Sequence, residues 1–333
     1  MKTAILAIIL FCVMIFPHEL GHFVAAKKMG VKVNEFAFGM GPIIWKKQRE
    51  ETLHSIRLFP IGGFCAMEGE DEDSPEPRAF SNKKPWQKIV VLVSGSLMNV
   101  ICALLVMILV VGTVGFTTTT IDLVNENSPA AYAQLMHGDE ITAIDGDEVD
   151  SWNDVSKGIV KSNGESIEVT VDRDGQTKTL TIQPEVNEDG GYVIGITSKV
   201  SHNPGRAVIE GTKATWNMTV TMFDTLGQLF TGKVGADDLS GPVGMVQMVS
   251  ETSQYGLWYY GFLTSLICLN LAIINMLPLP ALDGGRIIFV LYNMITGKEV
   301  SQKVEGTVHF IGIMLLFGLM IYVTFNDITR IFG

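Results

Sequence analysis

The sequence predicts a polytopic α-helical membrane protein with four transmembrane helices and one α+β domain inserted between the second and the third. Two observations carry this prediction. Apolar residues come in long blocks, whereas a soluble chain of 333 residues would spread them more evenly. A segment that alternates apolar and polar residues, as strands do, separates the second block from the third.

The apolar blocks have the length of membrane spans. The first runs from residue 4 to residue 26, and the others cover 89–114, 256–282 and 308–325, with His309 as the single ionisable residue of the last. A helix needs about 20 apolar residues to cross the hydrocarbon core, so the second and third blocks exceed that length and the fourth just reaches it. Four spans place both chain ends on one side of the membrane.

The first block also has features of a secretory signal peptide. Met1-Lys2 precedes a short apolar run, and Val24 and Ala26 are small residues that could precede a cleavage site. The block, however, contains His-Glu-Leu-Gly-His at 18–22, and a signal peptide has no use for three ionisable groups in its apolar region. We therefore predict a retained helix.

Basic residues set the expected orientation. They gather in the first and last loops, at Lys27, Lys28, Lys32, Lys83, Lys84, Lys88, Arg286, Lys298 and Lys303. Only Lys2 and Arg330 lie near the chain ends. By the positive-inside rule these loops are cytoplasmic, and the long segment 117–255 and both termini are outside. The histidine pattern and Asp283 then lie toward the cytoplasmic face.

The blocks and the charges between them divide the chain into eight segments. In order, we expect a first span (1–26), a cytoplasmic loop (27–88), a second span (89–114), an extracytoplasmic domain (115–200), a juxtamembrane amphipathic helix with a connector (201–255), a third span (256–285), a cytoplasmic loop (286–307) and a fourth span (308–325).

Charge and cysteines exclude some functions. The formal net charge of -11 comes in part from an acidic run at 68–76, which makes nucleic acid an unsuitable partner. Three of the four cysteines lie in apolar blocks and none has paired spacing, so we expect small apolar side chains that form neither disulfides nor metal sites.

The pattern His18-Glu19-Leu20-Gly21-His22 predicts a metal site. Histidines four residues apart lie on one face of a helix, so both imidazoles can bind one zinc ion. Glu19 is placed to take a proton from water. Each charge in a membrane helix costs roughly 2.5 to 3.5 kcal/mol, so ionisable residues kept there usually serve a site. The alternative is an interfacial segment with hydrated histidines.

A catalytic zinc ion usually has three protein ligands, so a third must come from elsewhere. Asp283 is the strong candidate, at the end of a stretch in which Pro278 and Pro280 break the helix. Irregular backbone at membrane depth is tolerated only where protein or a water-filled cavity surrounds it. The alternative is that the prolines only end a helix and Asp283 caps the next one.

Together these motifs resemble the site-2 protease family, in particular its bacterial regulator-of-sigma-E branch. The resemblance rests on His18-Glu19-x-x-His22 and on Asn275-x-x-Pro278-x-Pro280-x-x-Asp283-Gly284. It extends to Phe80-Ser81-Asn82-Lys83, Gly95-x-x-x-Asn99, Gly241-Pro242-Val243-Gly244 and Phe325-Asn326-Asp327, and so covers nearly the whole chain.

The resemblance implies an intramembrane zinc endopeptidase in a bacterial cytoplasmic membrane. It implies one zinc ion on His18, His22 and Asp283, with Glu19 as general base and Asn275 in contact with substrate. Substrates of the family are single-span membrane proteins, such as anti-sigma factors, or signal-peptide remnants. In the family, the stretch that includes Gly62-Gly63-Phe64 is a re-entrant β-hairpin whose edge strand pairs with the unwound substrate.

The outside segment resembles a PDZ domain. A short helix after Ser128, a Gly138-Asp139 turn, and two alternating stretches joined across Asp174-Gly175 carry this resemblance. Members of the branch often have two such domains, and this segment has room for one. Peptide binding at a sheet edge and simple obstruction of the site both remain open. The apolar and polar pattern of 206–234 predicts an amphipathic helix, either on the outer membrane surface or packed as a linker.

Two other functions compete with proteolysis. A non-catalytic, PDZ-bearing recruitment module would be expected to have lost Glu19 or a ligand, and all four residues are present. A zinc transporter would favour several acidic or histidine residues along a membrane path, and the remaining blocks have almost none. The sequence does not give the oligomeric state.

Overall fold

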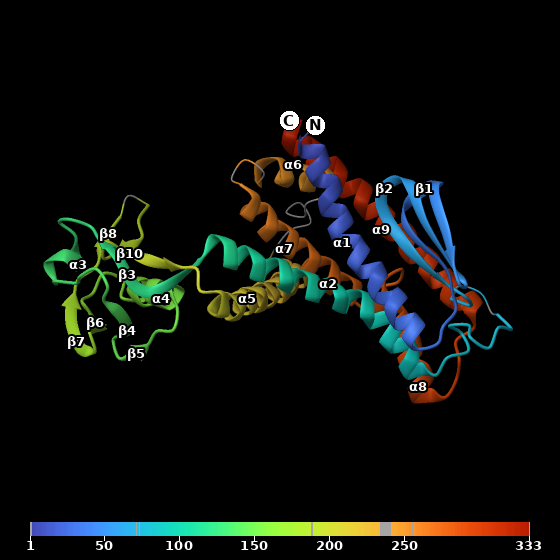
Figure 1. Ribbon diagram of the computed structural model, residues 1–333, viewed down its shortest axis with the longest axis horizontal. Helices are drawn as coiled ribbons and strands as arrows, with labels where there is room; N and C mark the ends of the chain where they lie inside the picture. The colour runs from blue at the N-terminus through green and yellow to red at the C-terminus, as the bar shows by residue number, and fades with distance from the viewer. Residues whose placement is uncertain are drawn as a thin grey trace. The chain divides into compact units, whose positions relative to one another are not determined.

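The computed structural model describes residues 2–70, 72, 74–187, 189–233, 241–252, 254 and 256–332. The chain forms two compact units, one made of Met1–Val110 with Gly211–Gly333 and one of Val111–Glu210. Figure 1 shows the elements of both. Four helices of the first unit are long and apolar enough to cross a membrane, and they contain Ile5–Lys28, Pro85–Val114, Trp258–Asn275 and Lys303–Arg330.

These four helices are α1 (Lys2–Lys28), α2 (Pro85–Val114), α7 (Leu257–Asn275) and α9 (Gln302–Phe332). α1 begins and α9 ends at the same end of the bundle (Figure 1). Most of their apolar side chains point outward: only 11% of the α9 span is buried, against 39% for α7. A soluble protein would not expose such faces, and lipid is the solvent that suits them. The protein is a multi-pass membrane protein.

The short helix α6 (Pro242–Thr252) is fastened to the end of α9. The buried carboxylate of Asp327 accepts hydrogen bonds from the backbone N–H groups of Gly241 at 3.0 Å and Gly244 at 2.8 Å. Gly241 immediately precedes α6 and Gly244 lies in its first turn, where a helix leaves N–H groups without intrahelical partners and favours negative charge. Two motifs that are distant in sequence therefore form one contact.

β1 (Val33–Arg49) and β2 (Thr52–Met67) are long strands that each fold back near the middle. Residues 35–38 pair with both 53–56 and 63–66, and residues 43–49 pair with 52–57. The two strands therefore make a small sheet of four segments. The second half of β2 forms one edge of this sheet and packs against α1, while the second half of β1 forms the other edge.

Charged residues hold the Glu50-Glu51 turn of this sheet to the end of α1. The Glu51 carboxylate accepts from Arg78 Nη1 and from Lys27 Nζ, both at 2.6 Å. These two cations, Arg78 foremost, lower the pKa of Glu51 to about 2. The turn at the opposite end is apolar, with Ile44, Trp45 and Phe59 exposed.

α5 (Pro204–Phe230) is the predicted amphipathic helix. In the first unit, its Met218 and Met222 pack against a cluster of Ala103, Cys268 and Leu269. These contacts are those of the packed linker helix, one of the two alternatives that the sequence left open.

α8 (Asp283–Thr296) occupies much of the segment that we predicted as a loop at 286–307. The loop prediction rested on Arg286, Lys298 and Lys303 and overlooked an apolar stripe. Ile287 and Val290 lie one turn apart and pack into the core at the end of α1 and α2, which stabilises a helix there.

The second unit is an α+β domain with its own core. β3 (Phe116–Val124), β4 (Glu140–Ile144), β6 (Ile167–Arg173), β7 (Gln176–Ile182) and β10 (Ile196–Ser201) form an antiparallel sheet in the order β10-β3-β4-β6-β7, and β5 (Asp147–Glu148) pairs with β4. β8 (Glu185–Val186) pairs with β9 (Tyr192–Val193). The predicted turn at Asp174-Gly175 joins β6 to β7.

Two helices, α3 (Pro129–Tyr132) and α4 (Trp152–Lys161), pack on this sheet, and aliphatic side chains such as Ile121, Val155 and Val169 fill the core. Asp139 is buried, and although burial opposes its ionisation, Arg173 Nε at 2.7 Å and the Met136 N–H hold the pKa of its carboxyl below the usual range. The α+β domain that the sequence predicted at 115–200 is present.

Candidate metal centre

α1 brings His18 and His22 together on one face, and Pro17 precedes them inside the helix. Because Pro17 has no N–H, the carbonyl of Val13 loses its helical donor. The Cys102 and Cys268 thiols point at this carbonyl, with Sγ–O distances of 4.0 and 3.9 Å. Both cysteines are free thiols in the structure, as are Cys12 and Cys65.

α2 lies directly against the histidines at Gly95. A Cβ atom at Gly95 would overlap His22 Nε2 and lie 2.8 Å from His18 Cε1, so only glycine leaves room for the two rings. One turn of α1 away from His18, a Cβ at Gly21 would overlap the carbonyl oxygen of Ser94. The backbones of α1 and α2 therefore approach closely, and this contact presses the imidazoles into a fixed place.

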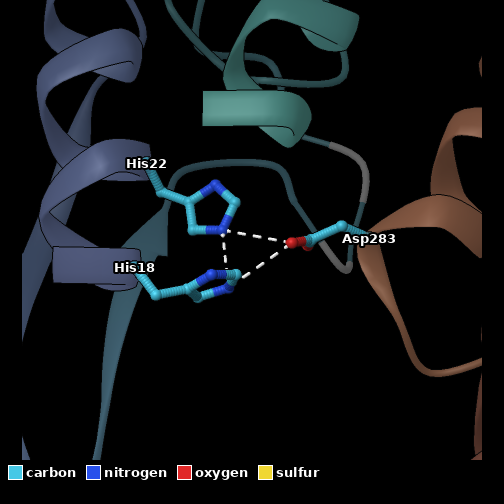
Figure 2. Close-up of side chains that lie close together, drawn as sticks. All are labelled: His18, His22 and Asp283. Carbon is cyan, nitrogen blue, oxygen red and sulfur yellow. Dashed lines mark hydrogen bonds and ion pairs between the residues drawn. The ribbon is translucent and has the colours of Figure 1, made fainter. Parts of the chain in front are cut away.

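Figure 2 shows His18 and His22 pointing at Asp283, which comes from the start of α8. The His18 and His22 Nε2 atoms are 3.2 Å apart, and each lies 3.4 Å from Asp283 Oδ2. Four ligands at about 2.0–2.1 Å around a tetrahedral zinc ion are separated by about 3.3–3.4 Å. The three atoms therefore have the spacing of one face of such a tetrahedron, and the fourth position is left for water or substrate.

The surroundings of the three side chains suit a cation. His18 and His22 are buried, at 8% and 7% exposed, and Asp283 Oδ2 is buried without a hydrogen-bond partner among the described residues. His22 Nδ1 lies 2.9 Å from the carbonyl oxygen of Val91, which requires the proton on Nδ1 and leaves the Nε2 lone pair free. A metal ion would satisfy these acceptor atoms, whereas an apolar void would leave them desolvated.

The loop 276–282 and α8 hold Asp283 opposite α1. α7 ends at Asn275, as Pro278 and Pro280 lead one to expect, and α8 begins at Asp283 itself. Cβ atoms at Gly284 and Gly285 would overlap the carbonyl oxygens of Leu277 and Leu279. The loop therefore folds tightly over the first turn of α8, and the two glycines after Asp283 permit this. Asp283 is the first residue of α8, but Leu282 is the N-cap and makes no side-chain cap hydrogen bond, so Asp283 does not cap this helix and its carboxylate faces the histidines instead.

Glu19 lies beside the histidines and against the edge of the β1–β2 sheet. Its carboxylate interacts with both imidazoles, with Asp283 and with the backbone of Cys65 in β2. A Cβ atom at Gly63 would come within 3.4 Å of Glu19 Cγ. The Glu19 carboxylate, the two imidazoles and the Asp283 carboxylate therefore meet beside the β2 edge of the sheet.

The predicted substrate-binding residues differ in how close they lie to His18, His22, Asp283 and Glu19. Asn275 Nδ2 is 3.3 Å from His18 Nε2, so its amide faces the ligand atoms. Gly63 faces Glu19, since a Cβ atom there would be in van der Waals contact with it. Gly62 has a φ of +93°, and a Cβ atom there would meet Met40 of β1, not the metal-site residues. The Phe64 ring lies under Arg57, 4.9 Å from Cζ, so it too contacts the sheet.

A family model described as peptidase family M50 matches residues 6–319. The chain belongs to this family. A relative from Clostridium acetobutylicum, named as a zinc metalloprotease, is 38% identical over 97% of this chain and 96% of its own length. The regulator of sigma-W protease RasP of Bacillus subtilis is 30% identical over 99% of both chains. The M50 chain is accordingly an intramembrane zinc metalloprotease of the site-2 class.

The two M50 relatives differ in length. The alignment with the Clostridium relative has 329 positions, whereas that with RasP has 418, so RasP holds segments with no counterpart in this 333-residue chain. A solved PDZ domain of an SdrC-like protein from Listeria innocua is 26% identical over 26% of this chain and 97% of its own length, with a TM-score of 0.23.

Sequence reasoning missed several residues of the M50 site. The Val91 carbonyl is a backbone group, so the identity of the side chain does not indicate its contact with His22. Gly95 was noted only through the family resemblance, which does not show that its missing side chain leaves room for the two imidazole rings. The ion pair of Arg286 with Glu70, at 2.8 Å between Nη1 and Oε1, links α8 to the end of β2 and joins residues 216 positions apart. Spacing along the chain cannot predict contacts of this kind.

Proposed function

We propose that His18, His22 and Asp283 bind the zinc ion of this protease and that Glu19 is its general base. The observation that carries the proposal is the triangle formed by the two Nε2 atoms and Asp283 Oδ2, with edges of 3.2, 3.4 and 3.4 Å, next to the partly buried carboxylate of Glu19. Among the described residues, this is the one group of three or more His, Cys, Asp or Glu side chains that could hold a metal ion. A transport path would need more such groups.

When bound, zinc supplies a Lewis acid that polarises a substrate carbonyl and lowers the pKa of a water molecule to about 7. Glu19 takes a proton from the attacking water and then delivers it to the leaving nitrogen, so that one carboxylate serves both steps. The Asn275 amide, which faces the ligand atoms, donates a hydrogen bond to the substrate next to the scissile bond.

We further propose that the second half of β2 receives the substrate as an added strand. Within the described residues this edge pairs with β1 on one side only, and its Gly63 faces Glu19 so closely that a Cβ atom there would contact Glu19 Cγ. A helical substrate hides its peptide bonds, so cleavage needs an extended segment, which strand addition provides. The apolar turn of the sheet around Ile44, Trp45 and Phe59 enters the bilayer from the cytoplasmic side, while the charged Glu50-Glu51 turn stays in water.

The proposed orientation places both termini and the α+β domain outside and the metal centre toward the cytoplasm. The lysines around the β1–β2 sheet and the charges of the α8–α9 loop support this orientation. The substrates are single-span membrane proteins, such as an anti-sigma factor, or signal-peptide remnants. The RasP relative, named as a regulator of sigma-W protease, supports a role in regulated intramembrane proteolysis. The α+β domain either binds peptide or limits access.

Glu19→Gln tests the assignment of the base. Purified protein in detergent is incubated with single-span model substrates, with and without a zinc chelator, and cleavage sites are mapped by mass spectrometry. We expect the variant to keep its zinc and to lose at least 10²–10⁴-fold in rate, which is the usual contribution of a positioned proton-transfer group. Glu185→Gln, in β8 of the other unit, is the matched control. Full activity of Glu19→Gln would refute the role.

A further inference from the structure

The loop that carries Asp283 depends on the last span for one of its backbone hydrogen bonds. Pro278 and Pro280 have no N–H, and Leu279 and Leu282 donate to carbonyls within the loop. Ala281 instead donates its N–H to the Nδ1 atom of His309 in α9, at 2.8 Å. A side chain from a helix 28 residues further along the chain thus holds the backbone two residues before Asp283.

The residue held in this way has an unfavourable backbone conformation. Ala281 has a φ of +74°, in the left-handed region where the Cβ of any residue other than glycine crowds the backbone. Such a conformation persists only when neighbouring structure enforces it, and it clusters at functional sites. If Ala281 relaxed, the chain would enter α8 in another direction and carry the Asp283 carboxylate away from the imidazoles.

His309 is itself fixed on several sides. Its side chain is 12% exposed, its ring packs against Phe289 of α8 with centroids 5.8 Å apart, and the Glu305 carboxylate lies 3.8 Å from Nε2. Because Nδ1 accepts from Ala281, the ring proton sits on Nε2, which faces this carboxylate. The tautomer that accepts the hydrogen bond is therefore the one that Glu305 favours.

One turn further along α9, Gly312 provides a second contact with the same loop. A Cβ atom there would overlap Pro280 Cβ and lie 2.7 Å from the Pro280 carbonyl carbon. At Gly318, on the same helix, no described residue lies within 4 Å of the position that a Cβ would take. α9 is the least buried of the four candidate spans. The contacts of His309 and Gly312 with the loop are therefore exceptions on a helix that is mostly exposed.

We infer that His309 and Gly312 are positioning residues that set the Asp283 carboxylate for zinc. His309 enforces the left-handed conformation of Ala281, and Gly312 lets α9 lie against Pro280. Neither touches the ligand atoms, so both act through the loop. This inference rests on the proposed function, in which Asp283 is a zinc ligand.

The test compares two near-isosteric substitutions of His309 in the full-length protein. Asn places its Oδ1 where Nδ1 lies and can accept the Ala281 N–H, whereas Leu has the same shape without an acceptor. Zinc affinity is measured by competition with a chelator, and the visible spectrum of the Co²⁺-substituted protein reports the ligand geometry. We expect His309→Leu to weaken zinc binding roughly tenfold or more and to change the Co²⁺ spectrum, while His309→Asn stays near wild type.

A second substitution isolates the mechanism. Glycine adopts positive φ without steric cost, so Ala281→Gly should restore most of the zinc affinity that His309→Leu loses. A merely structural role of His309 would not be rescued in this way. Equal affinity in His309→Leu and wild type, or a loss that is the same in His309→Asn and unrelieved by Ala281→Gly, overturns the inference for His309.

Gly312→Ala tests the other contact, with Gly318→Ala as the control on the same helix, and it keeps the inference testable if His309→Leu does not fold. We expect weaker zinc binding in the first variant and unchanged binding in the second. Wild-type affinity in Gly312→Ala contradicts the inference. Failure of the proposed function looks different, because zinc would then bind equally well to His22→Ala or not at all to the wild-type protein.

Discussion

At the scale of single residues, the proposed metal centre depends on the glycine at position 95 as much as on the three proposed ligands. The spacing of His18 and His22 and the isolated carboxylate of Asp283 could be predicted from the sequence, because helical periodicity and the cost of charge in a membrane are local arguments. The space at Gly95 and the Val91 carbonyl could not, because both come from a second helix whose approach the sequence does not encode in any spacing.

Gly95→Ala tests this account of the rings. Alanine favours a helix by about 1 kcal/mol over glycine, so α2 should form as well as before, yet the new methyl group would overlap His22 Nε2. We expect a folded protein with at least tenfold weaker zinc binding and a matching loss of proteolysis, measured by chelator competition and substrate cleavage.

Gly112→Ala is the control on the same helix, since a Cβ there would have an ordinary contact at 3.8 Å from Ala207. This variant should bind zinc as the wild type does. If Gly95→Ala also retained wild-type affinity, the rings would have to lie further from α2 than the structure places them.

At the scale of elements, the sequence was a better guide to spans than to the parts between them. Two uncharged blocks contain more residues than a helix needs to cross the bilayer, and they predict α2 and α7 directly. The four-segment sheet of β1 and β2 could not be predicted from the sequence. Its bends depend on residues 35–38 pairing with two other segments at once, 53–56 and 63–66. We predicted a loop where α8 lies, because the basic residues there were used to assign the side of the membrane. The apolar stripe of Ile287 and Val290, which packs into the core, is too short to stand out in the sequence.

Photo-crosslinking tests the proposed substrate strand at this scale. A photoactivatable residue in place of Phe64, on the β2 edge next to Gly63, should crosslink to a single-span substrate trapped in Glu19→Gln protein. The same residue in place of Lys47, on the opposite edge of the sheet, is the control. Because the two edges are separated by two strand segments, only the first should react near the scissile bond. Equal crosslinking at both edges would exclude strand addition at β2.

At the scale of the whole molecule, the inserted α+β domain has its own core and the bundle has its own site, and the sequence predicted this division from composition. Orientation in the membrane is a separate inference, drawn from the distribution of lysine and arginine between the loops and the chain ends. A membrane-impermeant thiol reagent should label Lys161→Cys in α4 from outside intact cells and should label Lys298→Cys, after α8, only once the membrane is broken. The reverse pattern would invert the proposed topology.

The central claim is that two imidazoles of α1 and the carboxylate that begins α8 bind one zinc ion. X-ray absorption at the zinc edge of the purified protein tests it most directly, because it reports the ligand atoms themselves. We predict nitrogen and oxygen ligands at about 2.0–2.1 Å with the outer-shell scattering of two imidazoles, reduced to one in His22→Ala. Sulfur ligands at about 2.3 Å, or a spectrum that His22→Ala leaves unchanged, would contradict the account.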